Sequence, residues 1–192
     1  MSTTTRPVPA TAPRTQDEIV TRAGVRRVLA LARVVIGFTF LWAFLDKLFG
    51  LGYSTPAAGA WINGGTPAQG YISGIDGPFA GFFGIFANPF GDALFMVGLA
   101  AIGIALIAGA GLRIAAVTGT LLMLFMFMAD LPAATAVVDG DLVRGSTNPI
   151  VDSHWHEALL LIIPAVTLAG DTWGAGRWWA RTPLVRRHRW LR

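Results

Sequence analysis

The chain alternates between long apolar runs and segments rich in charged residues, Gly and Pro. Four apolar runs cover about Arg27–Gly50, Gly91–Leu112, Ile114–Leu131 and His154–Ala169. About 20 apolar residues suffice for a helix to cross the ~30 Å hydrocarbon core of a bilayer. The pattern therefore predicts an all-α membrane protein, a four-helix transmembrane bundle with a long aromatic and Gly-rich outer loop between its first and second helices.

The charged residues divide between the two ends of these runs. The basic residues that flank one end are Arg6, Arg14, Arg22, Arg26, Arg27, Arg113, Arg177, Arg181, Arg186, Arg187, Arg189 and Arg192. The other end receives Asp46, Asp76, Asp92, Asp130, Asp139, Asp141, Asp152 and Glu157, with Lys47 and Arg144 as its cations. Because Lys and Arg near membrane ends stay in the cytoplasm, four crossings predict that both chain ends are cytoplasmic.

The pattern also predicts three regions along the chain. Residues 1–23 are rich in Thr, Pro and Ala, which predicts a disordered cytoplasmic tail, although Thr15 and Glu18 could cap a short helical lead-in. Residues 24–175 form the membrane domain. Residues 176–192 form a basic cytoplasmic tail, in which Trp side chains among Arg residues are typical of an interface anchor.

Composition narrows the class of protein. Of 192 residues, 54% are hydrophobic and 14% charged, whereas an ordinary soluble domain is about 25% charged. The pI near 10.6 does not point to nucleic acid, because the Arg residues cluster beside membrane ends, where they hold orientation and contact anionic lipid. Cysteine is absent, so disulfides, thiolate-held iron–sulfur clusters and c-type haem are excluded.

The segment between the first two runs, 51–90, carries more aromatic residues than a solvated linker. Its second half, 77–90, is too short and too rich in Gly for a fifth crossing. It predicts either a re-entrant or interfacial helix over the outer end of the bundle, or an aromatic belt that anchors a loop among the lipid headgroups.

Candidate chemistry lies at the outer end, because alternating helix directions bring charged residues from several runs to one level. His154 and Glu157 are three residues apart and share a helix face, whereas His156 is about 200° away from His154. Asp130 follows an unbroken apolar run, and an ionisable group at membrane depth needs a partner. The candidates are His154, Asp130 and Glu157 as catalytic residues, and Lys47, Asp46 and Trp61 as substrate-binding residues.

Each candidate also has a structural interpretation. Asp92 and Asp152 are placed to act as helix caps, and Lys47 could extend its amine to the interface. The set does not match the Glu-x-x-His pairs of a dimetal bundle, so no metal site is predicted. At the cytoplasmic end, Arg33 and Asp171 lie at a similar depth and are predicted to form a structural ion pair between the first and fourth helices.

Six motifs follow one another along the chain: Arg33-Val34-Val35-Ile36-Gly37-Phe38-Thr39-Phe40-Leu41, Asp46-Lys47-Leu48-Phe49, Ala60-Trp61-Ile62-Asn63-Gly64-Gly65, Gly77-Pro78-Phe79-Ala80-Gly81-Phe82-Phe83, Gly109-Ala110-Gly111-Leu112-Arg113 and Asn148-Pro149-Ile150-Val151-Asp152-Ser153-His154. Taken in this order, they resemble the DoxX family of small bacterial membrane proteins, in particular its DoxD-like members. The resemblance covers about residues 24–192. It implies a four-helix bundle in the bacterial cytoplasmic (inner) membrane and association with membrane redox complexes, including thiosulfate oxidation with quinone as acceptor.

Three functions remain open at this stage. The first is a membrane subunit of an oxidoreductase system that binds a quinone, or a small anionic reductant such as thiosulfate, in an outer-leaflet pocket; the expected cofactor is a quinone, with no metal, haem or iron–sulfur cluster. The second is a non-catalytic scaffold or assembly factor for other membrane or exported proteins. The third is an oligomeric proton-coupled carrier. The expected partners are the lipid membrane and a protein subunit or further copies of the chain, and not nucleic acid.

Overall fold

The computed structural model describes residues 14–131, 137–138, 141–142, 148 and 150–192. The helices in this part of the chain are α1 (Gln16–Ile19), α2 (Ala23–Phe49), α3 (Pro67–Ile72), α4 (Ala80–Gly84), α5 (Pro89–Ala108), α6 (Leu112–Ala129), α7 (Ser153–Val166), α8 (Gly176–Trp179) and α9 (Pro183–Arg187). Short 3-10 turns η1 (Ala57–Gly59), η2 (Trp61–Asn63), η3 (Ala169–Asp171) and η4 (Arg189–Leu191) connect them. One two-residue antiparallel pairing joins β1 (Val137–Val138) to β2 (Asp141–Leu142).

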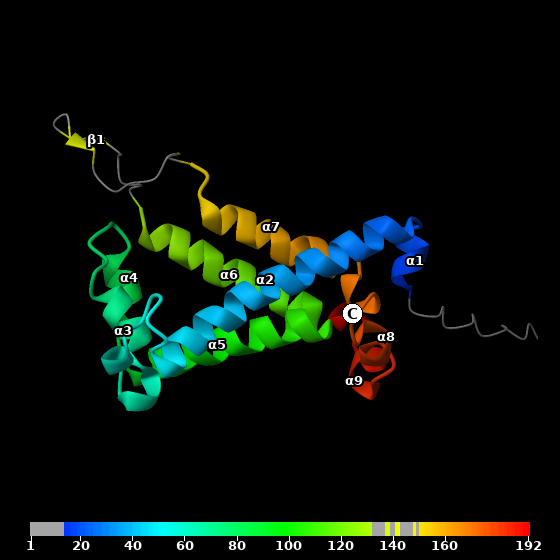
Figure 1. The fold of residues 1–192 in the computed structure, drawn as a ribbon, viewed down its shortest axis with the longest axis horizontal. Helices are drawn as coiled ribbons and strands as arrows, with labels where there is room; N and C mark the ends of the chain where they lie inside the picture. The colour runs from blue at the N-terminus through cyan, green and yellow to red at the C-terminus, as the bar shows by residue number, and fades with distance from the viewer. Residues whose placement is uncertain (1–13, 132–136, 139–140, 143–147, 149) are drawn as a thin grey trace, which may run out of the picture.

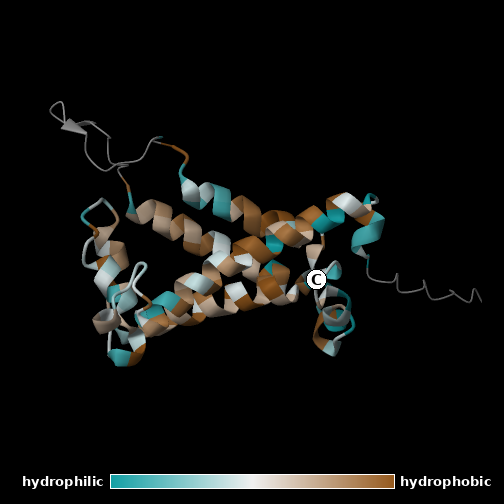
Figure 2. Cartoon of the chain, viewed as in Figure 1, coloured by the Kyte–Doolittle hydropathy of each residue, from teal (hydrophilic) through white to brown (hydrophobic). Residues whose placement is uncertain are grey.

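Three helices, α2, α5 and α6, are long and apolar enough to cross a membrane, with 27, 20 and 18 residues. Figure 2 shows their middle portions dominated by hydrophobic residues. Many of these side chains face outward, for example Val35 and Phe38 on α2 and Val117 on α6, each more than half exposed. An apolar surface of this extent is favourable only in hydrocarbon, so the chain is a membrane-associated, multi-pass protein.

Helix α7 completes the packing, although it is shorter. Contacts join α2 to α5, α5 to α6, α6 to α7 and α7 to α2 (Figure 1). At 14 residues α7 rises about 21 Å, which is less than one hydrocarbon thickness. The chain then turns through Leu168, which adopts a left-handed conformation (φ 51°), into η3. The predicted fourth crossing therefore stays a prediction.

Small residues allow the helices to approach closely. A Cβ on Gly103 would lie 2.7 Å from the backbone nitrogen of Leu41, and one on Gly119 would lie 2.7 Å from a Leu161 methyl group. Around these contacts, buried Ile36, Phe40, Leu99, Ile102, Leu106, Met123 and Leu161 form the core. Close packing of this kind is how helices associate where lipid tails are as apolar as the side chains.

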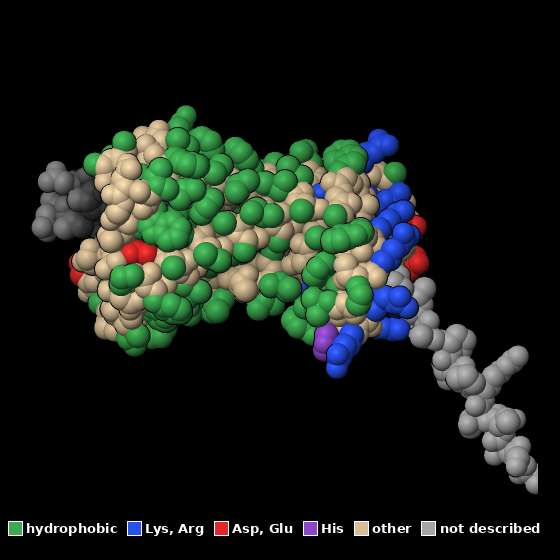
Figure 3. All heavy atoms as spheres, turned by 90° about the horizontal axis from the view of Figure 1, so that it is seen from below, with side chains coloured by type: hydrophobic (Ala, Val, Ile, Leu, Met, Phe, Trp, Pro, Cys, Tyr) green, Lys and Arg blue, Asp and Glu red, His purple; other side chains and the backbone are tan. Residues whose placement is uncertain are grey.

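The molecule has two polar ends, which we name by their contents. The loop end holds α3, α4 and the start of α7; the basic end holds α1, α8, α9 and η4 (Figure 1). Lys and Arg side chains gather at the basic end (Figure 3). This agrees with the sequence prediction that the basic residues share one end. The side chains of Asp139, Asp141 and Arg144 lie outside the part of the chain that the structure describes.

Part of the expected disordered tail is ordered. Residues 14–22 include α1, where the backbone N–H of Thr15 donates to the Glu18 carboxylate at 3.3 Å. Gln16 is buried, and its backbone N–H donates to Asp171 Oδ2 at 3.0 Å. These contacts anchor α1 to the basic end, which is why the prediction of disorder fails for 14–22; residues 1–13 lie outside the described residues.

Candidate functional site

Three polar side chains from separate elements meet at the loop end. Asp130 ends α6, Asp152 is the N-cap of α7, and His154 lies in the first turn of α7. One ligand atom from each residue lies within 4.8 Å of the others. The structure thus brings Asp130 and His154 together, and Asp152 lies with them. We call these three residues the loop-end cluster.

Asp152 holds His154 in place with both of its carboxylate oxygens. Oδ1 accepts the backbone N–H of His154 at 3.0 Å, as an N-cap does, and Oδ2 lies 2.6 Å from the ring atom Nδ1 of His154. The side chains of His154 and Asp152 are only 14% and 21% exposed. Because the carboxylate binds Nδ1, this ring nitrogen carries a proton, and Nε2 is left without a hydrogen bond to any described residue.

Tyr71 adds a hydroxyl group to the cluster from α3. Its hydroxyl donates to Asp130 Oδ1 at 3.1 Å. Partial burial, together with the nearby Asp130 carboxylate, raises the pKa of Tyr71 to about 12. The phenol therefore stays protonated and serves as a donor over the physiological range. The sequence indicates Tyr71 only as one of the loop aromatics and not as a site residue, because no local pattern connects residues 59 positions apart.

The arrangement is suited to proton exchange. Imidazole takes up and releases protons near neutral pH, and a carboxylate on one ring nitrogen orients the other toward a ligand. By distance alone the three groups could hold a metal ion. Both oxygens of Asp152 already accept hydrogen bonds from His154, so among the described residues Asp130 and Nε2 of His154 have the most capacity left for an ion. Common zinc sites have three or four protein ligands, so this set of described residues is a weak match to them.

The remaining predicted site residues lie apart from these bonds. Glu157 is half-buried one turn after His154, as the shared helix face predicts, and His156 is exposed. Lys47 and Trp61 are each partly buried, near the end of α2 and in η2. Among the described residues, none forms a hydrogen bond or ion pair with the side chain of Lys47 or Trp61. The substrate-binding role of these two residues stays a prediction.

Two buried carboxylates at the loop end are held by structural contacts. Asp46 accepts the backbone N–H groups of Tyr53 and Ser54 at 3.2 and 3.0 Å and the Ser54 hydroxyl at 2.6 Å, which fixes the turn after α2. Asp92 accepts the backbone N–H groups of Ala68 and Gln69 and the Gln69 side-chain amide. Asp92 is thus a cap, as expected, but of α3 rather than of its own helix, which Asn88 caps.

Aromatic rings lie next to the loop-end cluster. Phe127 on α6 and Trp155 on α7 meet edge to face with ring centroids 5.5 Å apart. Phe82 and Phe83 of α4 pack against Phe125 of α6, with centroids 5.7 and 6.1 Å from it. The aromatic loop therefore covers the end of α6, and Trp155, which follows His154 in the sequence, is 44% exposed.

At the basic end, the predicted ion pair between Arg33 and Asp171 is wrong. Arg33 is fully buried, and its guanidinium donates to the carbonyl of Leu106, to that of Ile107 at 2.8 Å and to those of Thr172 and Trp173 at 3.4 and 3.0 Å. Its charge is balanced by the carbonyl dipoles at the C-terminus of α5, where the helix macrodipole favours a cation. Arg33 therefore ties α2 to α5 and to the segment after η3.

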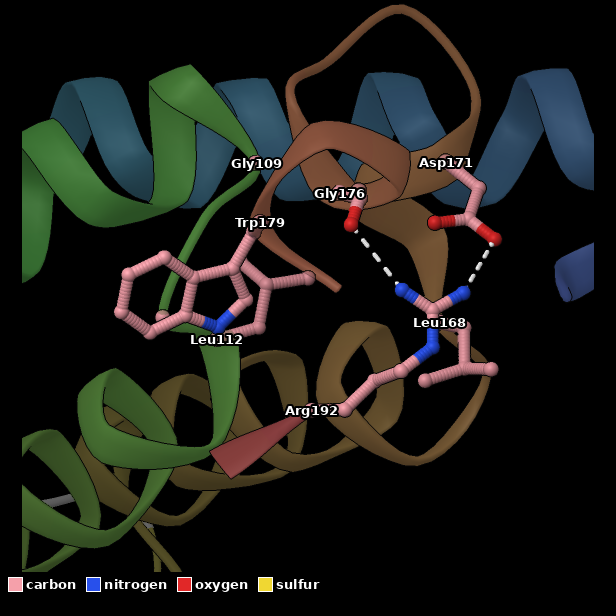
Figure 4. A pocket seen from close by; sticks show the side chains of 9 residues that line it. Gly109, Leu112, Leu168, Asp171, Gly176, Trp179 and Arg192 are labelled. Atoms are coloured by element: carbon pink, nitrogen blue, oxygen red, sulfur yellow. Dashed lines mark hydrogen bonds and ion pairs between the residues drawn. The ribbon is translucent and has the colours of Figure 1, made fainter. Parts of the chain in front are cut away.

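Asp171 pairs with Arg192 instead, at 2.8 Å between Oδ2 and Nη2 (Figure 4). Arg192 also donates to the carbonyl of Gly176 at 2.9 Å. These residues, with Trp179, Leu112 and Gly109, line a small hollow of about 20 Å³, which has room for about one water molecule. The guanidinium of Arg192 is bonded on one side of the hollow, so the residues around it hold the 176–192 segment in place. The hollow is too small for a large ligand.

No family model, curated protein or solved structure matches the chain.

Proposed function

We propose that the chain is a membrane subunit of an oxidoreductase system, and that the loop-end cluster binds the headgroup of a quinone and exchanges protons with it. The family resemblance stated from the sequence, to the DoxX and DoxD-like proteins of the bacterial inner membrane, forms part of this proposal. The observation that carries it is the bond of 2.6 Å between Asp152 and His154, which leaves Nε2 of a partly buried imidazole available beside Asp130.

The chemistry of the cluster favours a neutral ligand. Two carboxylates lie next to His154, and they repel a dianion such as thiosulfate, while Lys47 shows no contact that would offset them. A quinone headgroup is uncharged, and its ring fits beside the exposed face of Trp155. A hydroquinone oxidised here releases two protons and two electrons. In this proposal the two protons leave one after the other: Nε2 of His154 accepts each proton in turn and Asp130 passes it to water, while an oxidised redox group of a partner subunit takes both electrons.

The proposal includes four crossings with both ends in the cytoplasm. Helix α7 starts at the loop end, and the residues that follow it reach the basic end, where Gly170 lies against Gly109 at the end of α5. The chain thus covers the length of the bundle even though α7 itself is short. Its basic end carries the Lys and Arg excess that marks a cytoplasmic face (Figure 3).

A pair of histidine variants tests the function. The full chain is purified in detergent with a ubiquinone analogue, and bound quinone is extracted and quantified for the wild type, His154→Ala and His156→Ala. We expect His154→Ala to reduce retention at least about tenfold, because a placed hydrogen bond to a polar ligand contributes on the order of 1.5 kcal/mol. His156→Ala, on the exposed face, should match the wild type. Equal retention in all three proteins would exclude the quinone site.

The alternative function is a non-catalytic scaffold or assembly factor. It is favoured by the structural contacts of the buried carboxylates Asp46 and Asp92, which hold the 51–90 segment against the helices rather than facing a ligand. A stable partner protein that co-purifies without any quinone, and whose binding is lost when residues 61–72 are replaced by a Gly/Ser linker, would favour the scaffold over the oxidoreductase subunit.

A further inference from the structure

The segment 176–192 folds back onto the basic end with two different sides. Ala180, Val185 and Leu191 are buried, each at most 6% exposed. Trp178, Leu184 and Trp190 are at least half exposed. The segment is held by the indole N–H of Trp179, which donates to the carbonyl of Leu191 at 3.0 Å, and by Arg113, which donates to the carbonyl of Trp190 at 3.1 Å. The exposed side chains are therefore presented by a fixed backbone.

Arginines of this segment fall into two groups. Arg177 pairs with Asp17 at 3.2 Å, and Arg192 pairs with Asp171 at 2.8 Å. Four others are exposed, and their side chains form no hydrogen bond or ion pair with any residue that the structure describes: Arg181, Arg186, Arg187 and Arg189. These four positive charges alternate with the exposed Trp and Leu side chains and have no balancing acid next to them. They are the charges available to an external anion.

We propose that the 176–192 segment is a docking surface for anionic phospholipid at the cytoplasmic leaflet. Its exposed Arg side chains bind the phosphates of phosphatidylglycerol-type headgroups, and Trp178, Leu184 and Trp190 insert at the boundary of the headgroups and acyl chains. The proposal rests on the membrane placement given above but not on quinone binding.

The position and composition of the surface favour lipid over nucleic acid. The segment packs at the basic end, where α2 begins, α5 ends and α6 begins, and so lies at the level where hydrocarbon gives way to water (Figure 1). Exposed Trp side chains are enriched at this level of a bilayer. Binding to nucleic acid needs the positive charges but gives no reason for an exposed leucine such as Leu184 beside them, whereas insertion into lipid does.

The test measures lipid preference with the full chain. Protein in a neutral detergent is titrated with fluorescent phosphatidylglycerol and, separately, with phosphatidylcholine of the same acyl chains. Wild type should bind phosphatidylglycerol more tightly. Each Arg near an anionic surface accounts for about a fivefold change in affinity, so Arg186→Gln/Arg187→Gln should lower the preference about 25-fold. Neutralising Arg181 and Arg189 as well should abolish it. Thermal unfolding of each variant checks that it still folds, as expected for exposed side chains.

Two matched controls locate the effect. Asp17→Asn/Arg177→Gln removes a neutral pair from the same end and should leave the preference within about twofold. Arg22→Gln/Arg27→Gln removes two exposed charges at the start of α2, outside the proposed surface, and should cost about fivefold or less in total, because these charges act only through the general potential of the basic end. An equal loss in the Arg22/Arg27 and Arg186/Arg187 variants would overturn the proposal, since total charge alone would then explain binding. Displacement of phosphatidylglycerol by short duplex DNA at equal phosphate concentration would also overturn the proposal, because the surface would then prefer nucleic acid.

Discussion

The two polar ends of the molecule use their charged residues differently. At the basic end, the charge of Arg33 is buried among carbonyl groups, and the carboxylate of Asp171 is bonded to Arg192 and to the backbone of Gln16. At the loop end, considering the residues that the structure describes, His154 is bonded through one ring nitrogen, and the exposed Asp130 accepts a hydrogen bond from Tyr71.

This difference separates charges that hold the fold from charges that remain able to react. A buried charge is tolerated when polar groups balance it, as four carbonyl groups do for Arg33 although its Nε has no partner among the described residues, and removing such partners costs several kcal/mol. A partly exposed group with unused capacity contributes little to stability and can bind a ligand or a proton. We therefore expect substitutions at the basic end to change stability and those at the loop end to change binding.

The largest effect should come from Arg33→Met. The substitution leaves the carbonyls of Ile107 and Trp173 without their donor in a low-dielectric interior, so we expect a loss of about 3–5 kcal/mol in the free energy of unfolding. Thermal unfolding in detergent measures it. Arg33→Lys keeps the charge but loses the planar guanidinium, so its unfolding midpoint should lie between those of the wild type and Arg33→Met. An unfolding midpoint within a degree of wild type for Arg33→Met would contradict the role of this residue.

Gly109→Ala should follow, with Gly111→Ala as its matched control. Both glycines adopt positive φ, 72° and 70°, so both variants carry about 1–2 kcal/mol of backbone strain. A Cβ on Gly109 would also lie 2.9 Å from the Cα of Gly170, whereas a Cβ on Gly111 has nothing within 4 Å. Unfolding measurements should show Gly109→Ala to be less stable than Gly111→Ala by about 1–3 kcal/mol. Equal losses would mean that the end of α5 does not approach η3 closely.

A double-mutant cycle distinguishes the partners of Asp171. Asp171→Asn and Arg192→Gln should show a coupling energy of about 1–2 kcal/mol, because their atoms lie 2.8 Å apart and are nearly buried. Asp171→Asn combined with Arg33→Lys should be closer to additive. Stronger coupling of Asp171 to Arg33 than to Arg192 would restore the ion pair expected from the sequence.

The smallest effect concerns the Tyr71 phenol. Its pKa is raised from the ordinary value near 10 to about 12, so the folded state binds this proton more tightly than the unfolded state does. The associated stability is fully present below pH 10 and is lost as the pH rises from 10 through 12. Phenolate absorbance, compared between wild type and Tyr71→Phe, measures the titration. Asp130→Asn should lower the titration midpoint of Tyr71. A Tyr71 midpoint near pH 10 in both the wild type and Asp130→Asn would show that the side chains of Tyr71 and Asp130 are not in contact.

Sequence reasoning located the long helices well because the apolar runs are continuous. The predicted runs Arg27–Gly50, Gly91–Leu112 and Ile114–Leu131 correspond to α2, α5 and α6 with ends shifted by a few residues. The separation of His154 from His156 also followed from helix geometry alone. These features are local, so the chain itself encodes them in short windows.

The errors concern partners that are distant in the sequence. Arg33 and Asp171 were correctly placed at one end, but their actual partners depend on how the end of α5 approaches the 170–176 segment through glycines. Asp92 caps a helix that begins 25 positions before it, and Tyr71 reaches Asp130 across 59 positions. The position of a residue along a helix tells at which depth in the membrane its side chain lies. Which residue it bonds to depends on how the helices and loops pack in three dimensions.

The most direct measurement compares Asp152→Asn with Asp171→Asn for both unfolding midpoint and quinone affinity. Asn is as good an N-cap as Asp, so Asp152→Asn should keep the stability of α7 while removing the carboxylate that orients His154. The account predicts near-normal stability and at least about tenfold weaker quinone binding for Asp152→Asn, and the reverse pattern, lower stability with normal affinity, for Asp171→Asn. Wild-type quinone affinity in Asp152→Asn, or weakened affinity in Asp171→Asn, would contradict the division between the two ends.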